Sequence, residues 1–366
     1  EKLAKFLHQT GISSVPAIYR NFGTALINID GHKVELVMTR SESYRDRNRK
    51  PKVQYATLLQ DVMRRDFTIN SLLQNICTGE ILDLSGKGID DLKRGVIRAT
   101  DKPTIIFKED PLRILRAVRF ANRLNFAIEP ETQKYIKEHG SELEYISQER
   151  KREELEKILL SNRPADGIRL LFKFSLIDYL IPELREIENL EQNNYHCYDA
   201  LEHSLQVLGK TKAIIELRLA ALLHDIGKKR TYSKDKRIHF YNHEKIGAEM
   251  SRAIVQRLKF SGDTNNAVNL LVFNHMKFKN IGSKAEKISD RKIREMLNKW
   301  GEETFLLLRL VHADNLAHAP KHNLPKQIPA LWRKMRRIKK ELASLPMPVK
   351  GRDIIEFFNI SPGKEV

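Results

Sequence analysis

Short segments that alternate apolar and polar residues characterise the beginning of the chain. Residues 25–29 (ALINI) and 33–38 (KVELVM) flank the pair Asp30-Gly31. Two such segments around an Asp-Gly pair predict a β-hairpin with a tight turn. Residues 43–52 are almost all polar and rich in Lys and Arg, so we expect a flexible basic loop there.

The pattern changes to a helical period further along. A helix is expected over 58–73, followed by a second hairpin over 75–85 that turns at Thr78-Gly79. From Lys108 onward Gly and the β-branched residues Val and Thr become sparse, and Leu, Ile, Lys, Glu and Arg recur at helical spacing. The chain is therefore predicted to be an α+β protein, with a small β-containing head and a long, mostly helical body.

Composition narrows the class of protein. With 366 residues, of which 41% are hydrophobic and 31% charged, the chain should fold into two or more domains. No apolar run approaches the ~18 residues of a membrane helix, and the first ten residues lack the apolar core of a signal peptide. Cys77 and Cys197 lie far apart, so we expect no disulfide framework and a cytoplasmic location.

The charge balance points to a polyanionic partner. Lys and Arg number 65 and Asp and Glu 47, a net charge of +18, which favours nucleic acid binding. The densest basic stretches are 45–52, 228–237 and 333–340, although a solvated helix face explains the last one equally well. If about five phosphates are neutralised, the logarithm of affinity should fall with the logarithm of salt concentration with a slope near −4.

Residues 64–70 (RRDFTIN) carry the first candidate chemistry. Guanidinium groups such as that of Arg65 bind phosphates in a bidentate manner, and the side chains of Asp66 and Asn70 can bind ribose hydroxyls. The alternative is structural: Asp66 begins a helix and the arginines are solvated.

Residues 109–123 (EDPLRILRAVRFANR) form a second cluster, with Leu124 in its apolar arc. On a helical wheel, one arc is apolar, and the opposite arc carries Arg113, Arg116, Arg119 and Arg123. Glu109 and Asp110 precede Arg113 by four and three residues, so both can reach its guanidinium group. A rigid carboxylate–arginine cluster of this kind can present donors and acceptors to the Watson–Crick edge of a base. A salt-bridged amphipathic helix remains the alternative.

Four segments in order resemble a known family. They are RRDFTIN, the stretch from Asp83 through Gly88 to Asp91-Leu92-Lys93, EDPLRILRAVRF, and residues 149–155 (ERKREEL). Together they resemble consecutive motifs of the bacterial class II tRNA nucleotidyltransferase and poly(A) polymerase family, over about residues 22–185. The resemblance implies a nucleotidyltransferase head over 1–100 and a helical neck over 101–190 that binds RNA and nucleotide. It also implies Mg²⁺-dependent addition of C and/or A from CTP and ATP to the 3′ end of tRNA.

The resemblance assigns roles to individual residues. Those that match the motif for the triphosphate and ribose are Arg65, Asp66 and Asn70. Those that match the protein template for CTP and ATP are Glu109, Asp110 and Arg113, with Arg116 and Arg119 on the same helix. Those that match the motif bracing the neck are Glu149, Arg150 and Arg152. Glu35 resembles the third carboxylate of the catalytic site.

One part of the family pattern is absent. The family holds two metal ions on a Gly-x-Asp-x-Asp pair of an early strand. Residues 1–34 contain only Glu1 and Asp30 as carboxylates, and Gly88-Ile89-Asp90-Asp91 has a different spacing and place. We expect that the strands carrying the pair are missing from this sequence; the alternative is a head that has lost its polymerase activity.

A second site is predicted around residues 217–228 (LRLAALLHDIGK). His224 and Asp225 end an apolar helical run, and burying two ionisable groups costs several kcal/mol unless they are paired or bind a metal. This segment resembles the HD phosphohydrolase superfamily, over about residues 195–320. The resemblance implies metal ligation by His203, His224, Asp225 and Asp314, with His243 and His275 as further ligands or phosphate contacts.

These observations leave three hypotheses. The first is a tRNA nucleotidyltransferase whose HD domain covers 191–320, followed by a basic linker and a truncated tail over 321–366. The second is an HD phosphohydrolase that acts on RNA 3′ ends or nucleotides with Mg²⁺, Mn²⁺ or Ni²⁺, with an inactive head. The third is an RNA-binding protein without catalysis, in which the histidine cluster is a decayed site. The oligomeric state stays open.

Overall fold

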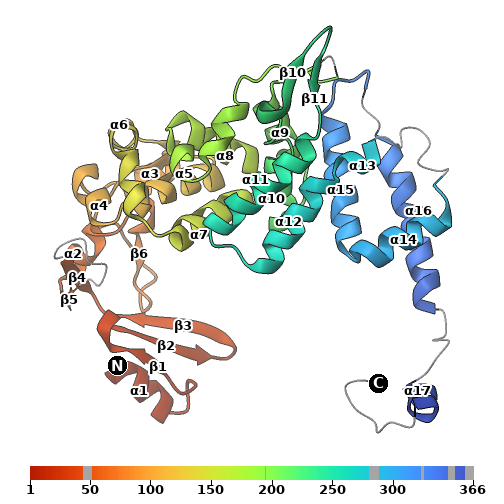
Figure 1. Cartoon of the computed structure of the whole chain (residues 1–366). Coiled ribbons are helices and arrows are strands. Elements are labelled where there is room, and N and C mark those ends of the chain that lie inside the picture. Colours follow the sequence, from red (N-terminus) through yellow and green to blue (C-terminus); the bar gives the residue numbers. More distant parts are fainter. Residues whose placement is uncertain (44–51, 194, 280–287, 323–324, 345–350, 359–366) are drawn as a thin grey trace. The chain divides into compact units, whose positions relative to one another are not determined.

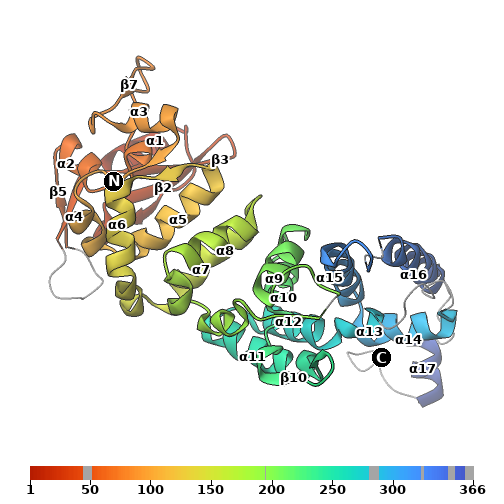
Figure 2. The same ribbon diagram turned by 90° about the horizontal axis from the view of Figure 1, so that it is seen from above.

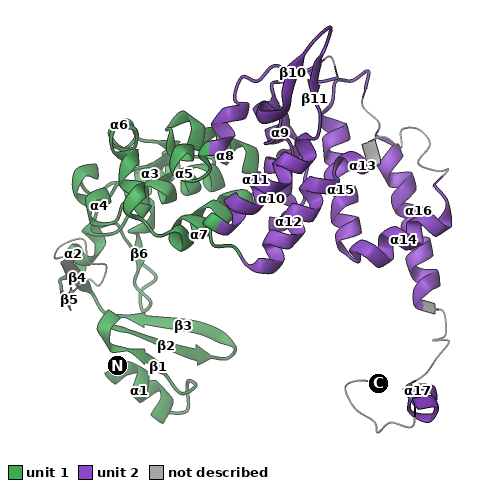
Figure 3. Cartoon of the chain, in the orientation of Figure 1, with its two compact units in different colours: residues 1–182, 257–260 green, residues 183–256, 261–366 purple. Residues whose placement is uncertain are grey.

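The computed structural model describes residues 1–43, 52–193, 195–279, 288–322, 325–344 and 351–358 (Figure 1). The chain divides into two compact units (Figure 3). Unit 1 comprises residues 1–182 and 257–260, and unit 2 comprises residues 183–256 and 261–366. Residues 44–51 of the basic loop predicted over 43–52 lie outside the described residues, and its end residues, Ser43 and Lys52, pair with each other as strand residues. Helices predominate after the first hundred residues, in agreement with the predicted α+β class.

The N-terminal sheet confirms the first hairpin. It has three antiparallel strands in chain order, β1 (Ala17–Tyr19), β2 (Thr24–Ile29) and β3 (His32–Val37). Asp30 and Gly31 both have positive φ, 49° and 82°, as the two central residues of a type I′ turn require. One face of the sheet packs on α1 (Lys2–Gln9) through Ala4, Ala25 and Ile27.

The prediction of a helix over 58–73 is confirmed for its first turns and is wrong beyond them. Helix α2 (Leu58–Met63) begins with a capping box between Thr57 and Gln60 and ends at Arg64. Phe67 then turns extended and buried, and forms an isolated β-bridge with Ala99. Pairing with a distant segment therefore replaces the helical continuation that local spacing favours.

The rest of unit 1 is a set of short strand pairs and helices. The second hairpin is confirmed at its turn, where Gly79 has φ +75°, but it spans residues 73–82, so that its first strand lies before the predicted start at residue 75. The two-stranded pairs are β4 (Arg40–Ser43) with β5 (Lys52–Tyr55), β6 (Leu73–Gln74) with β7 (Ile81–Leu82), and, in parallel, β8 (Val96–Ile97) with β9 (Ala127–Ile128). The helices are α3 (Gly88–Arg94), α4 (Pro103–Glu109), α5 (Leu112–Leu124), α6 (Pro130–His139), α7 (Gln148–Leu159) and α8 (Pro164–Lys173). Helix α5 packs against both α7 and α8 (Figure 2).

Unit 2 is a helical domain with one small hairpin, β10 (Tyr232–Lys234) and β11 (Ile238–Phe240). Its helices are α9 (Ala200–Gly209), α10 (Ile215–Leu223), α11 (His243–Arg257), α12 (Gly262–Asn274), α13 (Met276–Lys279), α14 (Asp290–Trp300), α15 (Glu303–Ala317), α16 (Gln327–Ser344) and α17 (Gly351–Phe358). Helix α10 is buried between α9, α12 and α15. The expectation of a linker after residue 320 is wrong for α16, because Ile328, Leu331 and Met335 are buried and α16 packs on α14 and α15.

Candidate nucleotide site and buried histidine–aspartate centre

Asp66 and Arg116 join two of the sequence motifs in unit 1. The Nε atom of Arg116 donates to Oδ2 of Asp66 at 2.8 Å. The other carboxylate oxygen of Asp66 accepts from the Asn70 side chain at 3.2 Å and from the Phe67 backbone at 2.9 Å. Asp66 is buried, while Arg116 is partly exposed. The carboxylate is therefore held in one orientation by two side chains and one peptide group.

Asp61 orders the two arginines of the RRDFTIN motif. Its buried carboxylate pairs with Arg64 at 2.7 Å and Arg65 at 3.1 Å, and also accepts from the backbone of Arg40 at 3.3 Å. Burial would raise the pKa of Asp61, but the hydrogen bond and charge of Arg64 outweigh it and lower that pKa. Sequence reasoning missed Asp61, although its spacing of three and four residues from the two arginines could have indicated the pairs.

The expected cluster around Arg113 divides into two separate pairs. Glu109 pairs with Arg113 at 3.2 Å, as its spacing predicted. The expectation for Asp110 is wrong: its carboxylate pairs with Arg150 at 2.7 Å and accepts from the Leu112 backbone at 3.2 Å. Asp110 ends α4 and points toward α7, which supplies the arginine from 40 residues away.

The arginines on α5 do not form one solvated arc. Arg113 and Arg119 are buried, whereas Arg123 is exposed. Arg113 donates to the backbone oxygen of Ile106 at 2.8 Å. Leu124, expected in the apolar arc, is 40% exposed. An amphipathic surface helix is covered on its apolar side only. Helix α5 is covered by both α4 and α7, so some of its polar positions are buried too.

The residues of the neck motif have different surroundings. Glu149 is exposed in the first turn of α7, where its charge favours the helix N-terminus. Arg152 donates to the backbone oxygen of Lys259 and lies 5.9 Å from the ring of Phe260. Glu154 is a further residue of this motif, to which the sequence assigned no role. Its carboxylate is buried and pairs with Arg119 at 2.6 Å.

Glu35 stands apart from this network. It lies on β3 opposite Leu26, with an exposed side chain. Its neighbours Val34 and Leu36 pack against the core, so Glu35 projects from the other face of the sheet. Among the described residues it forms no hydrogen bond or ion pair.

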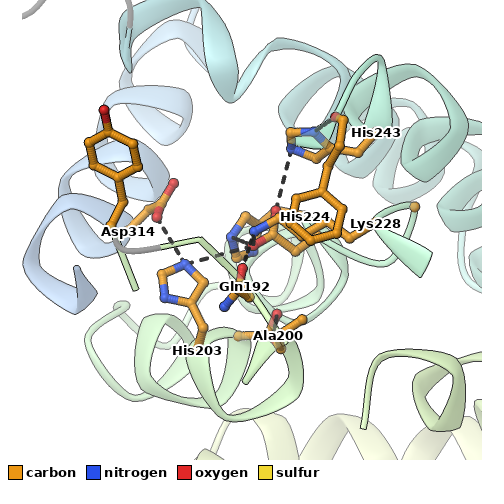
Figure 4. Close-up of polar contacts among 12 residues, drawn as sticks. Gln192, Ala200, His203, His224, Lys228, His243 and Asp314 are labelled. Atoms are coloured by element: carbon orange, nitrogen blue, oxygen red, sulfur yellow. Dashed lines mark hydrogen bonds and ion pairs between the residues drawn. The ribbon is translucent and has the colours of Figure 1, made fainter. Parts of the chain in front are cut away.

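All six residues predicted for the HD centre come together in unit 2. Figure 4 shows His203, His224, His243 and Asp314 among them. They lie at the ends or on the inner faces of helices and are at most 6% exposed: His203 on α9, His224 and Asp225 at the end of α10, His243 at the start of α11, His275 at the end of α12, and Asp314 on α15. Two triads have the spacing of metal ligands, His203–His224–Asp225 and Asp225–His243–His275, because the ligand atoms within each triad lie within 4.8 Å of one another.

The protonation of the rings follows from their backbone contacts. Nδ1 of His224 lies 2.9 Å from the carbonyl oxygen of Ala221. A carbonyl only accepts, so Nδ1 of His224 carries the proton and the neutral ring has a lone pair on Nε2. That lone pair faces Oδ2 of Asp225 at 3.1 Å. Oδ2 of Asp225 also has the Lys228 ammonium group at 2.6 Å; Nε2 of a neutral His224 and the carboxylate together form a donor set suitable for a divalent metal ion.

The charges at the centre favour an ionised Asp225 and neutral His203 and His243. Burial would raise the pKa of Asp225, but His224 and Lys228 hold it well below its ordinary value. Burial lowers the pKa of His203, against the opposing effect of Asp314. Burial also lowers the pKa of His243, against Asp225. Deprotonated histidines and a carboxylate are the forms that bind metal.

Lys228 belongs to this centre and not to a basic surface. It is 4% exposed and its ammonium group lies 2.6 Å from Oδ2 of Asp225, with Gln192 as a second partner. The expectation that 228–237 is a phosphate-binding stretch is therefore wrong at its first residue. A pocket of about 460 Å³ is lined by Cys197, Tyr198, Lys210 and His318 among others. Of these, His318 contacts a residue of the centre, since its Nδ1 is 2.7 Å from the Asp314 carbonyl oxygen.

Family models match three successive segments. Residues 1–98 match the poly A polymerase head domain, residues 125–187 the probable RNA and SrmB-binding site of polymerase A, and residues 196–319 the HD domain. Head domains of this type and HD domains are metal-dependent in general. None of the described helices is long and apolar enough to cross a membrane.

Two curated relatives are informative. The A-adding tRNA nucleotidyltransferase of Deinococcus radiodurans is 31% identical over 327 residues, which cover 84% of this chain and 73% of that protein. The CC-adding tRNA nucleotidyltransferase of Thermus thermophilus is 34% identical over 232 residues, 60% of this chain and 52% of that protein. The chain thus spans about half the length of the second relative.

Solved structures share the fold. The CCA-adding enzyme of Bacillus stearothermophilus in complex with CTP has a TM-score of 0.61 at 22% identity, covering 95% of this chain and 75% of that one. A tRNA nucleotidyltransferase complexed with a primer tRNA and an incoming ATP analog has a TM-score of 0.59 at 24% identity, covering 93% and 88%. Fold and motifs together define a nucleotidyltransferase with a helical body. The chain belongs to the tRNA nucleotidyltransferase and poly(A) polymerase family.

Proposed function

We propose that the protein is a tRNA nucleotidyltransferase that adds C and/or A nucleotides from CTP and ATP to the 3′ end of tRNA. The observation that carries the proposal is the pairing of three motifs across 40 to 50 residues of chain: Asp66 with Arg116, and Asp110 with Arg150. These pairs support a preformed nucleotide site, because they hold charged groups in fixed orientations before any ligand is bound.

In this proposal each motif either binds a different part of the nucleotide or supports the residues that bind it. Arg65 binds the triphosphate, and Asp66 and Asn70 bind the ribose hydroxyls. Glu109, Asp110 and Arg113 select the base, with Arg116 and Arg119 beside them on α5. Glu149, Arg150 and Arg152 brace α7 so that the template residues keep their geometry, and Glu35 contributes a carboxylate for Mg²⁺. Carboxylate and guanidinium groups provide the planar acceptors and donors that distinguish one base edge from another.

Nucleotide binding is the first step to test, because residues 1–34 hold no Gly-x-Asp-x-Asp pair. Binding of CTP, ATP, UTP and GTP to the full chain should be measured by calorimetry. We expect CTP and ATP to bind more tightly than UTP and GTP. Arg113→Ala should weaken CTP and ATP binding roughly ten- to a hundredfold, the effect of losing one charged hydrogen bond of about 1.5–3 kcal/mol.

Arg123→Ala is the matched control, since Arg123 is an exposed arginine on the same helix. Equal affinity for all four nucleotides, or equal losses in both variants, would contradict the base-selecting role. Incubation of the chain with Mg²⁺, CTP, ATP and tRNA lacking its CCA end, followed by sequencing of the 3′ ends, tests the complete reaction. Ordered addition supports the whole proposal; binding without addition limits it to the nucleotide site.

A second function, hydrolysis of phosphate esters on RNA ends or nucleotides, is favoured by the buried acceptor cluster of unit 2. His203, His224, Asp225 and Asp314 would hold a divalent ion such as Mg²⁺, Mn²⁺ or Ni²⁺. Such an ion lowers the pKa of a bound water toward ~7 and so supplies a hydroxide nucleophile. The pocket beside His318 and Lys210 is large enough for a phosphorylated ligand.

Release of phosphate from 2′,3′-cyclic and 2′-phosphorylated nucleotides with each metal tests this function. We expect Asp225→Ala to abolish hydrolysis and to leave CTP and ATP binding unchanged. Hydrolysis that persists in Asp225→Ala would assign the activity to another site or a contaminant.

A further inference from the structure

The pocket of about 460 Å³ in unit 2 has walls of two kinds. Leu316 and Pro320, at the end of α15 and just beyond it, form part of an apolar wall. Tyr198, which precedes α9, and Lys210, which follows it, supply an aromatic ring and a positive charge. Of the lining residues within the described ranges, none is Asp or Glu. The volume falls within the range of small-molecule sites, about 300–1,000 Å³, and suits a ligand of the size of one nucleoside.

The pocket adjoins the histidine–aspartate centre through His318. The ring centroid of His318 lies 5.4 Å from that of His203, and Nδ1 of His318 lies 2.7 Å from the backbone oxygen of Asp314. Gln206 and Lys210, which line the pocket, follow His203 by three and seven residues, so the three share one face of the helix. At 1.5 Å per residue, Lys210 lies about 10 Å along the helix from His203. One nucleotide unit can therefore extend from the centre to Lys210.

A buried glutamine connects the aromatic wall of the pocket to the same centre. The side-chain amide of Gln192 donates to the backbone oxygen of Tyr198 at 3.2 Å. Its amide oxygen accepts from Lys228, which pairs with Asp225 at 2.6 Å. Tyr198 is 42% exposed, so its ring is available to stack on a base, the contact by which proteins bind unpaired nucleotides of any sequence.

Lys210 is the charged group of the pocket. It is exposed, and its side chain forms no hydrogen bond or ion pair with any residue that the structure describes. Because no described acidic residue lines the pocket, the ammonium charge is available to an anion there. An apolar wall, a ring for stacking and one cation are the features of a site for a nucleoside that carries a phosphate.

We propose that this pocket binds the terminal nucleoside of an RNA chain, and that Lys210 contacts the phosphodiester on the 5′ side of that nucleoside. The terminal 2′ or 3′ phosphate then lies at the histidine–aspartate centre. This inference rests on the hydrolysis proposed for that centre. It narrows the substrates from RNA ends or nucleotides to RNA ends, because a free nucleoside 2′,3′-cyclic phosphate has no group for Lys210 to bind.

The reaction itself needs water as its only second reactant. The oxygen of water forms a bond to phosphorus, and one bond between phosphorus and a ribose oxygen breaks. The ribose oxygen takes up a proton from the water. A 2′,3′-cyclic phosphate is thereby opened to a monophosphate, and a monophosphate is released to leave a hydroxyl group. Lys210 and Tyr198 take no part in these steps and determine only which substrate is bound.

The two cysteines of the chain provide a test that is independent of activity. Both are exposed, but Cys197 lines the pocket, whereas Cys77 lies between β6 and β7 of unit 1. The full chain is alkylated with iodoacetamide in EDTA, so that no hydrolysis occurs, and the rate at each cysteine is followed by mass spectrometry of peptides. The probes are adenosine and the dinucleotide CpA, which adds a phosphodiester on the 5′ side of adenosine.

We expect both probes to slow alkylation of Cys197 and to leave Cys77 unaffected. CpA should act at about tenfold lower concentration than adenosine, because it adds one charged contact. Lys210→Met should abolish this preference. Lys212→Met is the matched control, since Lys212 is an exposed lysine that does not line the pocket, and it should keep the preference. Tyr198→Leu should raise the protecting concentration of both probes roughly tenfold through the loss of stacking.

Three results would overturn the assignment of the pocket. The first is equal protection by adenosine and CpA in the unsubstituted chain, a comparison that does not depend on the folding of any variant. The second is a preference for CpA that survives Lys210→Met. The third is protection by inorganic phosphate at the same concentration as by CpA, which would show a site for anions alone.

Hydrolysis with a divalent metal separates the pocket from the proposed function. Adenosine 2′,3′-cyclic phosphate is compared with CpA that ends in a 2′,3′-cyclic phosphate, and we expect at least a tenfold higher kcat/KM for the dinucleotide. Hydrolysis without protection of Cys197 would overturn the pocket and leave the hydrolytic centre intact. Protection by CpA without any hydrolysis would retain the nucleoside site and overturn its role in selecting RNA ends for hydrolysis.

Discussion

Arg119 and Glu154 form a buried ion pair, with 2.6 Å between Nε and Oε2 and side-chain exposures of 9% and 3%. The pair joins α5, which carries the template motif, to α7, which carries the neck motif. Arg119 also lies over the ring of Phe120 at 4.2 Å. Burial lowers the pKa of Arg119, and Glu154 opposes that effect. The base-selecting part of the proposed site thus depends on a charge pair that water does not reach.

Removing one partner of this pair should be far more harmful than removing both. We expect Arg119→Leu and Glu154→Leu each to lower the free energy of unfolding by about 3–5 kcal/mol, because each leaves a buried charge without its partner. The double variant should cost much less than the sum of the two. Urea denaturation of the four proteins provides the double-mutant cycle; additive losses would show that the two charges do not interact.

Asp61 should make the stability of the head depend on pH. Its pKa is lowered from 3.8 in the fold, so the unfolded chain takes up the proton first as pH falls. The stabilisation is fully present above about pH 5 and is lost as pH falls below 3.8 through the lower folded value. At pH 6, Asp61→Asn should therefore lower the free energy of unfolding by roughly 1–3 kcal/mol. The variant should unfold at a lower denaturant concentration.

The difference between the two proteins should shrink steadily toward pH 3. Other carboxylates titrate in both proteins and cancel in this comparison. Denaturation curves at pH 6, 4.5, 3.8 and 3 measure it, and a difference that stays constant over this range would mean that the charge of Asp61 is irrelevant to stability.

Gly227 should be intolerant of any side chain. A Cβ atom there would lie 2.4 Å from the carbonyl oxygen of His243 and 2.6 Å from the backbone nitrogen of Gly247. Because backbone atoms cannot rotate away, Gly227→Ala should displace α11 and with it His243, and so reduce metal binding. Gly247→Ala is the control, since its Cβ would meet the nearest atom at 3.4 Å. The melting temperature and the amount of bound metal should be measured for both variants. Equal values in the two variants would contradict the close approach of Gly227 to the backbone of α11.

The positive charge of the native Lys228 should weaken the binding of a metal ion at the histidine–aspartate centre. Its ammonium group occupies Oδ2 of Asp225 at 2.6 Å, and Asp225 is one of the residues proposed to hold the metal ion. Lys228→Met removes a competing positive charge and leaves the carboxylate uncompensated in the metal-free protein. We expect the metal-free variant to melt at a lower temperature and to bind Co²⁺ at least tenfold more tightly, by calorimetry. Lys229→Met, a change at the neighbouring exposed lysine, should leave both values unchanged. Weaker binding in Lys228→Met would instead make Lys228 a support of the metal site.

Local features could be predicted from sequence where neighbours along the chain decide them. The hairpin at Asp30-Gly31 follows from two residues that tolerate positive φ between alternating segments. The pair Glu109–Arg113 follows from a spacing of four residues, which here joins the end of α4 to the beginning of α5. The helical body follows from its period, and the identities of the buried histidines and aspartates follow from their motif.

Other features depend on partners that are distant in sequence. Phe67 leaves the helical pattern because it pairs with Ala99, Asp110 turns to Arg150 instead of Arg113, and Lys228 is buried against Asp225 instead of lying on a basic surface. Periodicity and spacing describe only the order of residues along one element. The partner of a charged group, and which way each oxygen of Asp225 faces, are decided by the packing of separate helices, because burial removes water as the alternative partner.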